Sequence, residues 1–370
     1  MQIRIERRRS VPTWMVIIST VVGVAIALLF GALLLSWGGI SPLVAYRAML
    51  NVGFLESYSF SDTLVKATPL ILAGLAVTVA FRMKLWNIGA EGQLQMGAWA
   101  ATGVALFWLP PETPKAVMLT GMIVAGMVAG GIWGWIPGIL KARLNVNEII
   151  TSLMLVYVAL LWNSYFVFGP WSAGGFGLTA PYPRTAWFPR LLDLADQFPE
   201  VRGMTVHLGV ILAIIVAVIL YILFRVGKWG YILNVIGDNP VVARYAGMNI
   251  SRMIVTTFVI SGAIAGLAGV SEVAGAVHRL GDNFSPGYGF TAIIVAWLAR
   301  LNPIAVVIVG YLFGGLLVGG DAIQPAGISL MIQGIVLFCV ISADLLTRYR
   351  LIIERSPEAI SEKEAAHVGD

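Results

Sequence analysis

Long stretches without aspartate, glutamate, lysine or arginine recur along the chain. Most hold enough apolar residues to cross a bilayer, whose hydrocarbon core of about 30 Å needs about 20 helical residues. We therefore predict about ten membrane-spanning helices joined mostly by short polar connections. The predicted spans cover residues 10–46 (apolar core 14–35), 67–81 with an upstream extension past Lys66, 92–111, 116–140, 149–168, 203–224, 253–271, 283–299, 301–320 and 322–343.

The apolar stretch 283–320 is too long for one crossing, because a single helix would measure about 55 Å. Asn302-Pro303, next to Arg300, is the expected break, since proline lacks the backbone N–H that a helix needs. Two interpretations remain: two short crossings with Arg300 at the cytoplasmic surface, or a re-entrant hairpin. An arginine in the middle of the bilayer costs at least about 2.5–3.5 kcal/mol, which favours two short crossings.

Composition supports the same fold class. Apolar residues make up 58% of the chain and charged residues only 12%, about half the roughly 25% of soluble domains. The single cysteine, Cys339, cannot form an internal disulfide. Soluble, disordered and disulfide-rich classes are therefore excluded, and we predict an all-α polytopic membrane protein.

The 24 lysines and arginines are unevenly distributed among the loops. With the amino terminus inside, most of them face the cytoplasm, so the positive-inside rule places both termini there. The basic residues 7–9 before an apolar run also resemble a signal peptide. That run is longer than a typical signal sequence and no cleavage site follows it, so we interpret it as a retained first helix.

These assignments predict one transmembrane domain over residues 1–346 and a charged cytoplasmic tail over 347–370. The long loop 169–205 falls on the extracytoplasmic side. It is either a solvated connector or a docking platform for a soluble partner.

Residues 237–249 predict a short cytoplasmic helix. Asn239 is a good N-cap, Pro240 a good first residue, and Gly247 can adopt the positive φ that ends a helix. Two turns are too short to be stable alone in water. We expect its apolar side chains to pack against another surface; these are Val241, Val242 and Tyr245. The segment therefore binds a partner surface or lies on the lipid headgroups.

Two glycine-rich polar breaks carry further candidate chemistry. The first holds Asn87, Glu91 and Gln93 at the start of the third span. Glu91 would cap this helix through its dipole, brace two halves of the protein, or contact a substrate in the pathway.

The second break follows the seventh span. It combines carboxylate, amide and aromatic groups suited to a sugar or a base: Glu272, Asn283, Phe284 and Tyr288. A plain Gly-Pro turn with interfacial aromatic residues is the alternative. Lys66, inside the second span, either extends outward to water or lines a pathway.

A faint internal repeat relates the two breaks. Residues 72–76 (LAGLA) match residues 264–268 (IAGLA), and the predicted topology gives the two spans opposite directions. Inverted repeats of this kind are typical of transporters. No phosphate-binding G-x-x-x-x-G-K-[ST] loop occurs and the three histidines are scattered, so we expect no ATPase activity, metal site or cofactor in this chain.

Several segments together resemble one protein family. They are NIGAEGQLQMGA at 87–98, GDNPVVARYAGMN at 237–249, ISGAIAGLAG at 260–269, RLGDNFSPGYGFTAIIVAWLARLNP at 279–303 and LFGGLLVGGDAIQ at 312–324. The chain, from about residue 61 to 346, is similar to permease subunits of bacterial ABC importers in the branched-chain amino acid/simple sugar permease family, nearest the nucleoside-importing branch. Trp297 and Ala299 depart from the family pattern, which has smaller residues or glycine before the arginine.

The resemblance implies a type II-like importer permease in the bacterial inner membrane that moves a nucleoside or a simple sugar. It implies that the segment of Asn239, Pro240, Val241, Val242, Arg244, Tyr245 and Gly247 couples to a separate ABC ATPase. A second permease, similar or identical, and an extracytoplasmic substrate-binding lipoprotein are the other implied partners. Without the resemblance, the repeat alone also allows an ion-coupled secondary transporter.

Overall fold

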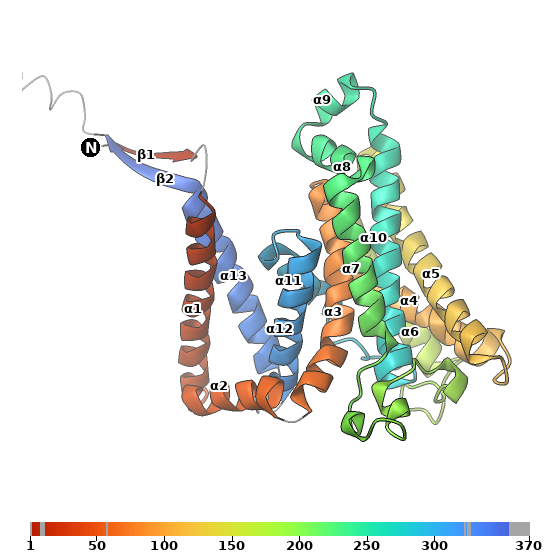
Figure 1. Ribbon diagram of the computed structural model, residues 1–370. Helices are drawn as coiled ribbons and strands as arrows, with labels where there is room; N and C mark the ends of the chain where they lie inside the picture. Colours follow the sequence, from red (N-terminus) through yellow and green to blue (C-terminus); the bar gives the residue numbers. More distant parts are fainter. Residues whose placement is uncertain (1, 8–11, 57, 322, 324–326, 355–370) are drawn as a thin grey trace, which may run out of the picture. The chain divides into compact units, whose positions relative to one another are not determined.

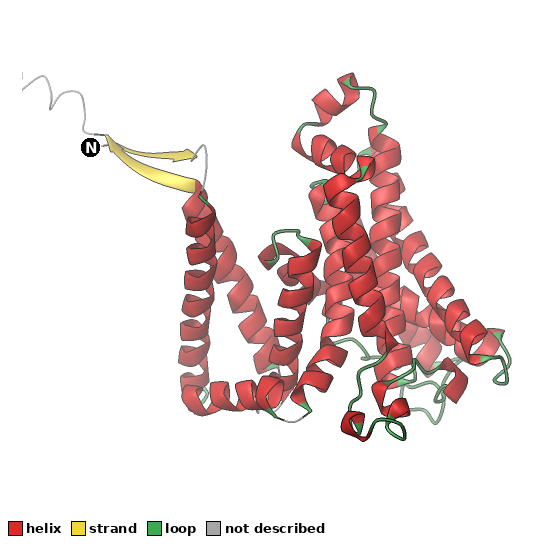
Figure 2. Cartoon of the chain, viewed as in Figure 1, coloured by secondary structure: helices red, strands yellow, loops and turns green. Residues whose placement is uncertain are grey.

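The computed structural model describes residues 2–7, 12–56, 58–321, 323 and 327–354, and most of these are helical (Figure 2). Contacts divide the chain into two units, which we describe separately. Unit 1 comprises Met1–Ala45 and Leu330–Asp370, and unit 2 comprises Tyr46–Ser329. The helix α2 (Pro42–Leu50) contains the boundary between them.

Unit 1 pairs the two ends of the chain. Its helices are α1 (Thr13–Trp37) and most of α13 (Ile328–Arg348), which approach closely at Gly23, where an added Cβ would lie 3.1 Å from the Cα of Val340. An antiparallel strand pair joins β1 (Gln2–Arg7) to β2 (Tyr349–Glu354), with Gln2 opposite Glu354. These strands were not predicted. They include part of the predicted tail 347–370, of which residues 355–370 lie outside the described residues.

Unit 2 holds the remaining elements (Figure 1). In chain order they are η1 (Asn51–Leu55), α3 (Ser59–Arg82), α4 (Ala90–Gly103), η2 (Val104–Trp108), α5 (Lys115–Leu144), α6 (Glu148–Phe168), η3 (Arg184–Ala186), η4 (Leu191–Leu194), η5 (Pro199–Val201), α7 (Leu208–Val226), α8 (Lys228–Asp238), α9 (Pro240–Tyr245), α10 (Ile250–Glu272), η6 (Val273–Val277), α11 (Tyr288–Leu298) and α12 (Pro303–Asp321).

Seven helices of the described chain are long and apolar enough to cross a membrane, and three shorter apolar helices accompany them. The seven are Ile18–Trp37, Ser59–Arg82, Lys115–Leu144, Glu148–Phe168, Leu208–Val226, Ile250–Val277 and Pro303–Asp321; the shorter ones are Pro42–Leu55, Tyr288–Leu298 and Leu330–Ala343. The predicted class of an all-α polytopic membrane protein is confirmed. The predicted third span, α4 with η2, is not among them, because the buried Glu91, Gln93 and Gln95 lower its hydropathy.

The expected break between α11 and α12 is present. Arg300 and Leu301 both adopt left-handed backbone angles, with φ of 52° and 57°, directly before Asn302-Pro303. The 11 residues of α11 give it a length of about 16 Å, which is half of a bilayer core. Non-helical residues precede it, so α11 is a half-length helix rather than the full short crossing that was favoured.

Glycines bring α10 into direct backbone contact with its neighbours. A Cβ on Gly266 would lie 2.2 Å from the carbonyl oxygen of Gly126 on α5, and one on Gly130 would lie 2.3 Å from that of Gly262. On the α4 side, a Cβ on Gly97 would lie 2.3 Å from the carbonyl oxygen of Gly266. Small residues are the usual means by which membrane helices pack this closely. α10 therefore lies directly on α4 and α5, while α3 is the most buried of the spanning helices.

The two segments of the predicted repeat lie on α3 and α10, which run in opposite directions through unit 2 (Figure 1). Each long helix leads into a non-helical segment and then a shorter helix, α4 or α11. The polar residues of the two breaks are thereby brought to neighbouring helix starts.

Candidate transport pathway and coupling segment

The segment around α9 has the local geometry expected from its sequence. The side-chain oxygen of Asn239 accepts hydrogen bonds from the backbone N–H groups of Val241 and Val242, at 3.0 and 3.2 Å. Pro240 occupies the first helical position. After the helix, Gly247 has a φ of +74°, a conformation that other residues rarely adopt.

α9 presents apolar side chains to the outside. Val241, Val242 and Tyr245 are 62%, 54% and 90% exposed, while Ala243 is buried. Arg244 is also exposed. α8 and α9 lie together at one end of unit 2, and the loop containing η3, η4 and η5 lies at the opposite end (Figure 1). An exposed apolar surface on a six-residue helix is typical of a docking contact.

α8 was not predicted, although the sequence carries a signal for it. Gly230, Leu233 and Ile236 are its buried residues, and their spacing of three residues places them on one helix face. The end of α8 lies beside the turn after α3, where an exposed ion pair of 3.0 Å joins Asp238 to Lys84. At Gly237 an added Cβ would lie 2.7 Å from the carbonyl oxygen of Arg82.

Asn87 and Gln93 form a buried brace. Their side-chain amides exchange two hydrogen bonds of 3.0 and 3.1 Å, and the amide nitrogen of Asn87 also donates to Ser261 on α10 at 2.9 Å. The Ser261 hydroxyl in turn donates to the carbonyl of Ala76 on α3. These bonds link α3, α4 and α10, so the geometry fits a structural tie between the three helices.

Glu91 joins the starts of α4 and α11. Its buried carboxylate accepts a hydrogen bond of 2.6 Å from the backbone N–H of Gly289 and one of 3.2 Å from Gln95. The Ser285 side chain also bonds to it. A carboxylate at two helix N-termini is favoured by both dipoles, so the geometry fits capping and bracing together.

Glu272, Tyr288 and Lys66 form a buried polar cluster contributed by α10, α11 and α3. The Tyr288 hydroxyl donates to Glu272 Oε1 at 3.4 Å, and Lys66 Nζ lies 3.4 Å from the Tyr288 hydroxyl and 3.9 Å from Glu272 Oε1. The Lys66 side chain is 38% exposed and that of Glu272 only 1%. Glu272 Oε2 has no hydrogen-bond partner among the described residues. Lys66 is therefore the member of the cluster that reaches the surface, while Glu272 Oε2 is its buried polar atom without a partner among the described residues.

Asn283 and Phe284 lie apart from these bonded groups, in the segment between η6 and α11. Asn283 is exposed, and Phe284 is buried. The predicted seven pathway residues thus separate into a brace, a helix-start carboxylate, a charged cluster and this connecting segment.

A cluster at the opposite end of unit 2 from α9 was missed by sequence reasoning. The rings of Trp187 and His278 stack with centroids 3.7 Å apart, and Arg184 lies over Trp187 at 4.1 Å. Arg190 contacts His278 Nε2 and donates to the carbonyl of Gly275. Burial, with the charge of Arg190, lowers the pKa of His278 to about 4. These residues hold the loop 169–205 against η6, which follows α10.

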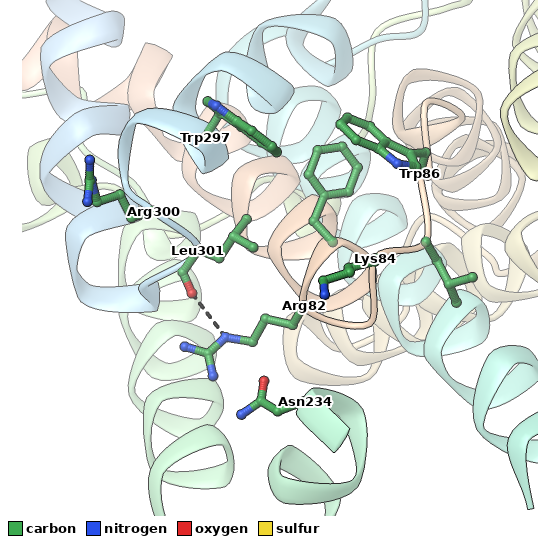
Figure 3. Close-up of a pocket in the computed structure, with 9 residues that line it drawn as sticks. Arg82, Lys84, Trp86, Asn234, Trp297, Arg300 and Leu301 are labelled. Carbon is green, nitrogen blue, oxygen red and sulfur yellow. Dashed lines mark hydrogen bonds between the residues drawn. The ribbon is translucent and has the colours of Figure 1, made fainter. Parts of the chain in front are cut away.

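A pocket of about 610 Å³ lies near α8, at the ends of α3 and α11 (Figure 3). The indole rings of Trp86 and Trp297 stack with centroids 5.7 Å apart. Arg82 extends across the pocket and donates to the carbonyl of Leu301 at 3.1 Å. The lining residues are Phe81, Arg82, Lys84, Leu85, Trp86, Asn234, Trp297, Arg300 and Leu301. Trp297, which departs from the expected family pattern, is thus part of an aromatic wall.

Apolar spanning helices, glycine-mediated packing, broken helices with buried polar groups and an exposed terminal helix define a multi-pass membrane transport protein. The chain matches, over residues 59–341, the family described as branched-chain amino acid transport system / permease component. It belongs to this family, as the sequence motifs predicted.

Curated relatives agree with this membership. The glucose ABC transporter permease protein of Haloferax volcanii is 36% identical over 358 residues, covering 95% of this chain and 93% of the relative. A guanosine ABC transporter permease protein of Bacillus subtilis is 36% identical over 301 residues, covering 80% and 84%. A second guanosine permease protein of that organism is 26% identical over 255 residues, covering 68% and 78%. The predicted function as a permease component is confirmed.

Proposed function

We propose that this chain is the permease subunit of an ABC importer for a nucleoside or a simple sugar, and that a separate subunit hydrolyses the ATP. The proposed coupling to the ATPase is supported by the exposed apolar surface of α9, which Val241, Val242 and Tyr245 form. No G-x-x-x-x-G-K-[ST] loop occurs in the sequence, so the chain does not have this phosphate-binding loop for ATP.

The proposed coupling runs through α8 and α9. An ATPase that binds α9 moves it together with α8, whose last residue is tied to the α3–α4 turn by the Lys84–Asp238 pair. Beyond α9, Asn249 caps α10 through a hydrogen bond of 2.9 Å from the backbone N–H of Arg252. Movement of the docked segment therefore reaches both α3 and α10.

Co-purification tests the docking. The chain is expressed with the ABC ATPase from the same gene neighbourhood, and the recovered ATPase is measured for wild type, Tyr245→Ala and Tyr165→Ala. We expect loss of the ATPase only in Tyr245→Ala, because the control residue Tyr165 is also exposed, at 66% against 90% for Tyr245, but lies on α6, far from α9 in the sequence. Equal recovery in all three would identify α9 as a helix on the lipid headgroups.

For the substrate pathway, we propose the cluster of Glu272, Tyr288 and Lys66. A carboxylate, a phenol and an ammonium group can bond to the hydroxyl groups that sugars and nucleosides share, and the relatives are named for glucose and guanosine. Asn87, Gln93 and Glu91 then position the helices, and Asn283 and Phe284 line the approach.

Uptake into proteoliposomes tests this assignment. Glu272→Gln and Tyr288→Ala should reduce transport of labelled guanosine or glucose while the ATPase stays bound. Tyr182→Phe is a control that also removes a buried hydroxyl, one bonded to Thr102 instead. If both cluster variants transport at the wild-type rate, Glu272 and Tyr288 only shape the turn and do not contact the substrate.

The remaining partners follow from the same proposal. Two different guanosine permeases of one organism match this chain, which supports a second, non-identical permease beside it. A substrate-binding lipoprotein would deliver the solute at the end of unit 2 opposite α9, in a bacterial inner membrane with both termini in the cytoplasm. Cysteines at Leu191 and Val242 should label from opposite sides; labelling from one side would overturn the orientation.

An ion-coupled transporter is the competing function. It predicts uptake by this chain alone when a Na⁺ or H⁺ gradient is applied. The importer proposal predicts no uptake until the ATPase and ATP are supplied.

A further inference from the structure

We propose that the pocket between α3, α8 and α11 is a regulatory site for a nucleoside phosphate. This inference rests on the proposed function, which places the pocket in the cytoplasm, but it concerns a different ligand from the transported solute. The pocket volume of about 610 Å³ falls in the range of about 300–1,000 Å³ that is typical of small-molecule sites.

Aromatic residues give the pocket a stacking surface. Trp86 stacks on Trp297, and Phe81 lies 4.9 Å from the Trp86 ring. Trp86 is 41% exposed, so part of its ring is open to a planar ligand. Aromatic side chains bind nucleobases through stacking without strong preference for one base.

Charge in the pocket favours an anion. Of its nine lining residues, three are cationic and none is acidic: Arg82, Lys84 and Arg300. Arg82 lies across the pocket, and Arg300 stands at its edge (Figure 3). Arginine and lysine are the usual partners of phosphate groups. A transported nucleoside is uncharged, so these cations fit its phosphorylated form better than the nucleoside itself.

The pocket is connected to the coupling segment. Asn234 of α8 lines it, and Lys84 reaches from it to Asp238, the last residue of α8. The next residue, Asn239, caps α9. A phosphate bound by Lys84 competes with the Asp238 carboxylate for the same ammonium group, which releases the end of α8 and slows transport.

Left-handed residues shape the backbone at the pocket. Lys84, Arg300 and Leu301 are non-glycine residues with positive φ of 55°, 52° and 57°. Only Asn145 and His278 share this property elsewhere in the described chain. These residues directly follow α3 and α11, where left-handed residues commonly end helices, so two helix ends shape the rim of the pocket.

Equilibrium dialysis of the full chain in nanodiscs of zwitterionic lipid tests the proposal, with guanosine 5′-monophosphate, guanosine and inorganic phosphate as probes. We expect the monophosphate to bind at least about tenfold more tightly than either fragment, since each contributes only part of the contacts. Trp297→Ala should weaken its binding by about 5- to 150-fold. Trp135→Ala, an exposed tryptophan on α5, should leave binding unchanged.

Asp238→Asn separates ligand recognition from a merely structural role. It removes the carboxylate that competes for Lys84, so binding of the monophosphate should tighten, whereas Lys84→Gln should weaken it. A structural role alone predicts that both variants act in the same direction, which would overturn the proposal.

Three further results would also overturn it. The first is equal binding of guanosine and its monophosphate, and the second is no binding of the monophosphate at all. The third is loss of monophosphate binding when the nanodisc lipid is changed to anionic phosphatidylglycerol. None of these results tests the proposed function, because guanosine or glucose uptake by the complete importer is measured separately, without added monophosphate. Conversely, absent uptake with intact monophosphate binding would reject the import assignment alone.

Discussion

Removal of the Lys66 charge should destabilise the protein far more than removal of its partner. Lys66 is the cation nearest to the buried Glu272 carboxylate, at 3.9 Å. At this distance and an effective dielectric constant of about 20, the Coulomb attraction is about 4 kcal/mol. More than a third of the Lys66 side chain is exposed, so water screens part of this, and we expect a net coupling of about 1–3 kcal/mol.

The asymmetry between the two single variants follows from burial. Lys66→Met leaves a buried carboxylate without a counterion, which costs up to about 3–5 kcal/mol where the carboxylate stays charged; taking up a proton lowers this cost, so unfolding is measured at alkaline pH. Glu272→Gln leaves an ammonium group that still reaches water, so its cost is smaller. The double variant Lys66→Met, Glu272→Gln should recover most of the stability lost in Lys66→Met.

Reversible unfolding in mixed SDS micelles measures these free energies of unfolding. Lys115→Met is the matched control, since Lys115 is exposed at the start of α5. If the effects of the two single changes simply add in the double variant, within about 0.5 kcal/mol, the two groups are not coupled and the reasoning is refuted.

Three other predictions concern packing, capping and pH. Gly266→Ala places a Cβ 2.2 Å from a backbone carbonyl oxygen of α5 and should lower the free energy of unfolding by about 1–3 kcal/mol; Gly334→Ala, with no atom within 4 Å, should not. Asn239→Ala removes two capping hydrogen bonds, worth about 0.5–2 kcal/mol, so hydrogen exchange over 241–246 should accelerate; unchanged exchange would contradict the capping role. The pKa of His278, lowered to about 4, lies below its unfolded value of about 6.5. The unfolded chain therefore binds a proton that the folded chain does not, and wild type should lose stability as the pH falls from about 6.5 to 4. His278→Gln should reduce this loss, and a wild type that is equally stable across the window would reject the argument.

Local signals predicted the parts of the fold that local interactions determine. Asn239, Pro240 and Gly247 act within two helical turns, so the short helix and its ends could be read from the sequence. The break before Pro303 is equally local. The 228–238 helix had a readable apolar spacing that was not used.

Contacts between distant residues could not be predicted in this way. Glu91 and Gly289 are 198 positions apart, and no spacing rule connects them. The strands β1 and β2 come from opposite ends of the chain, so neither sequence segment indicates its partner. Polar residues were therefore identified as candidates, whereas their division into a brace, a helix-start carboxylate and a charged cluster depends on tertiary contacts.

The glycine contacts of α10 with α5 and α4 have a mechanical consequence for unit 2. Backbone lies directly on backbone at Gly266 and Gly130, so no side chain separates the helices at these positions, and sliding there would force backbone atoms together. They form a rigid block against which the other elements turn. Spin labels on α5 and α10 should therefore keep a constant separation throughout a transport cycle, whereas the proposed coupling to an ATPase predicts a changing separation between labels on α8 and α10.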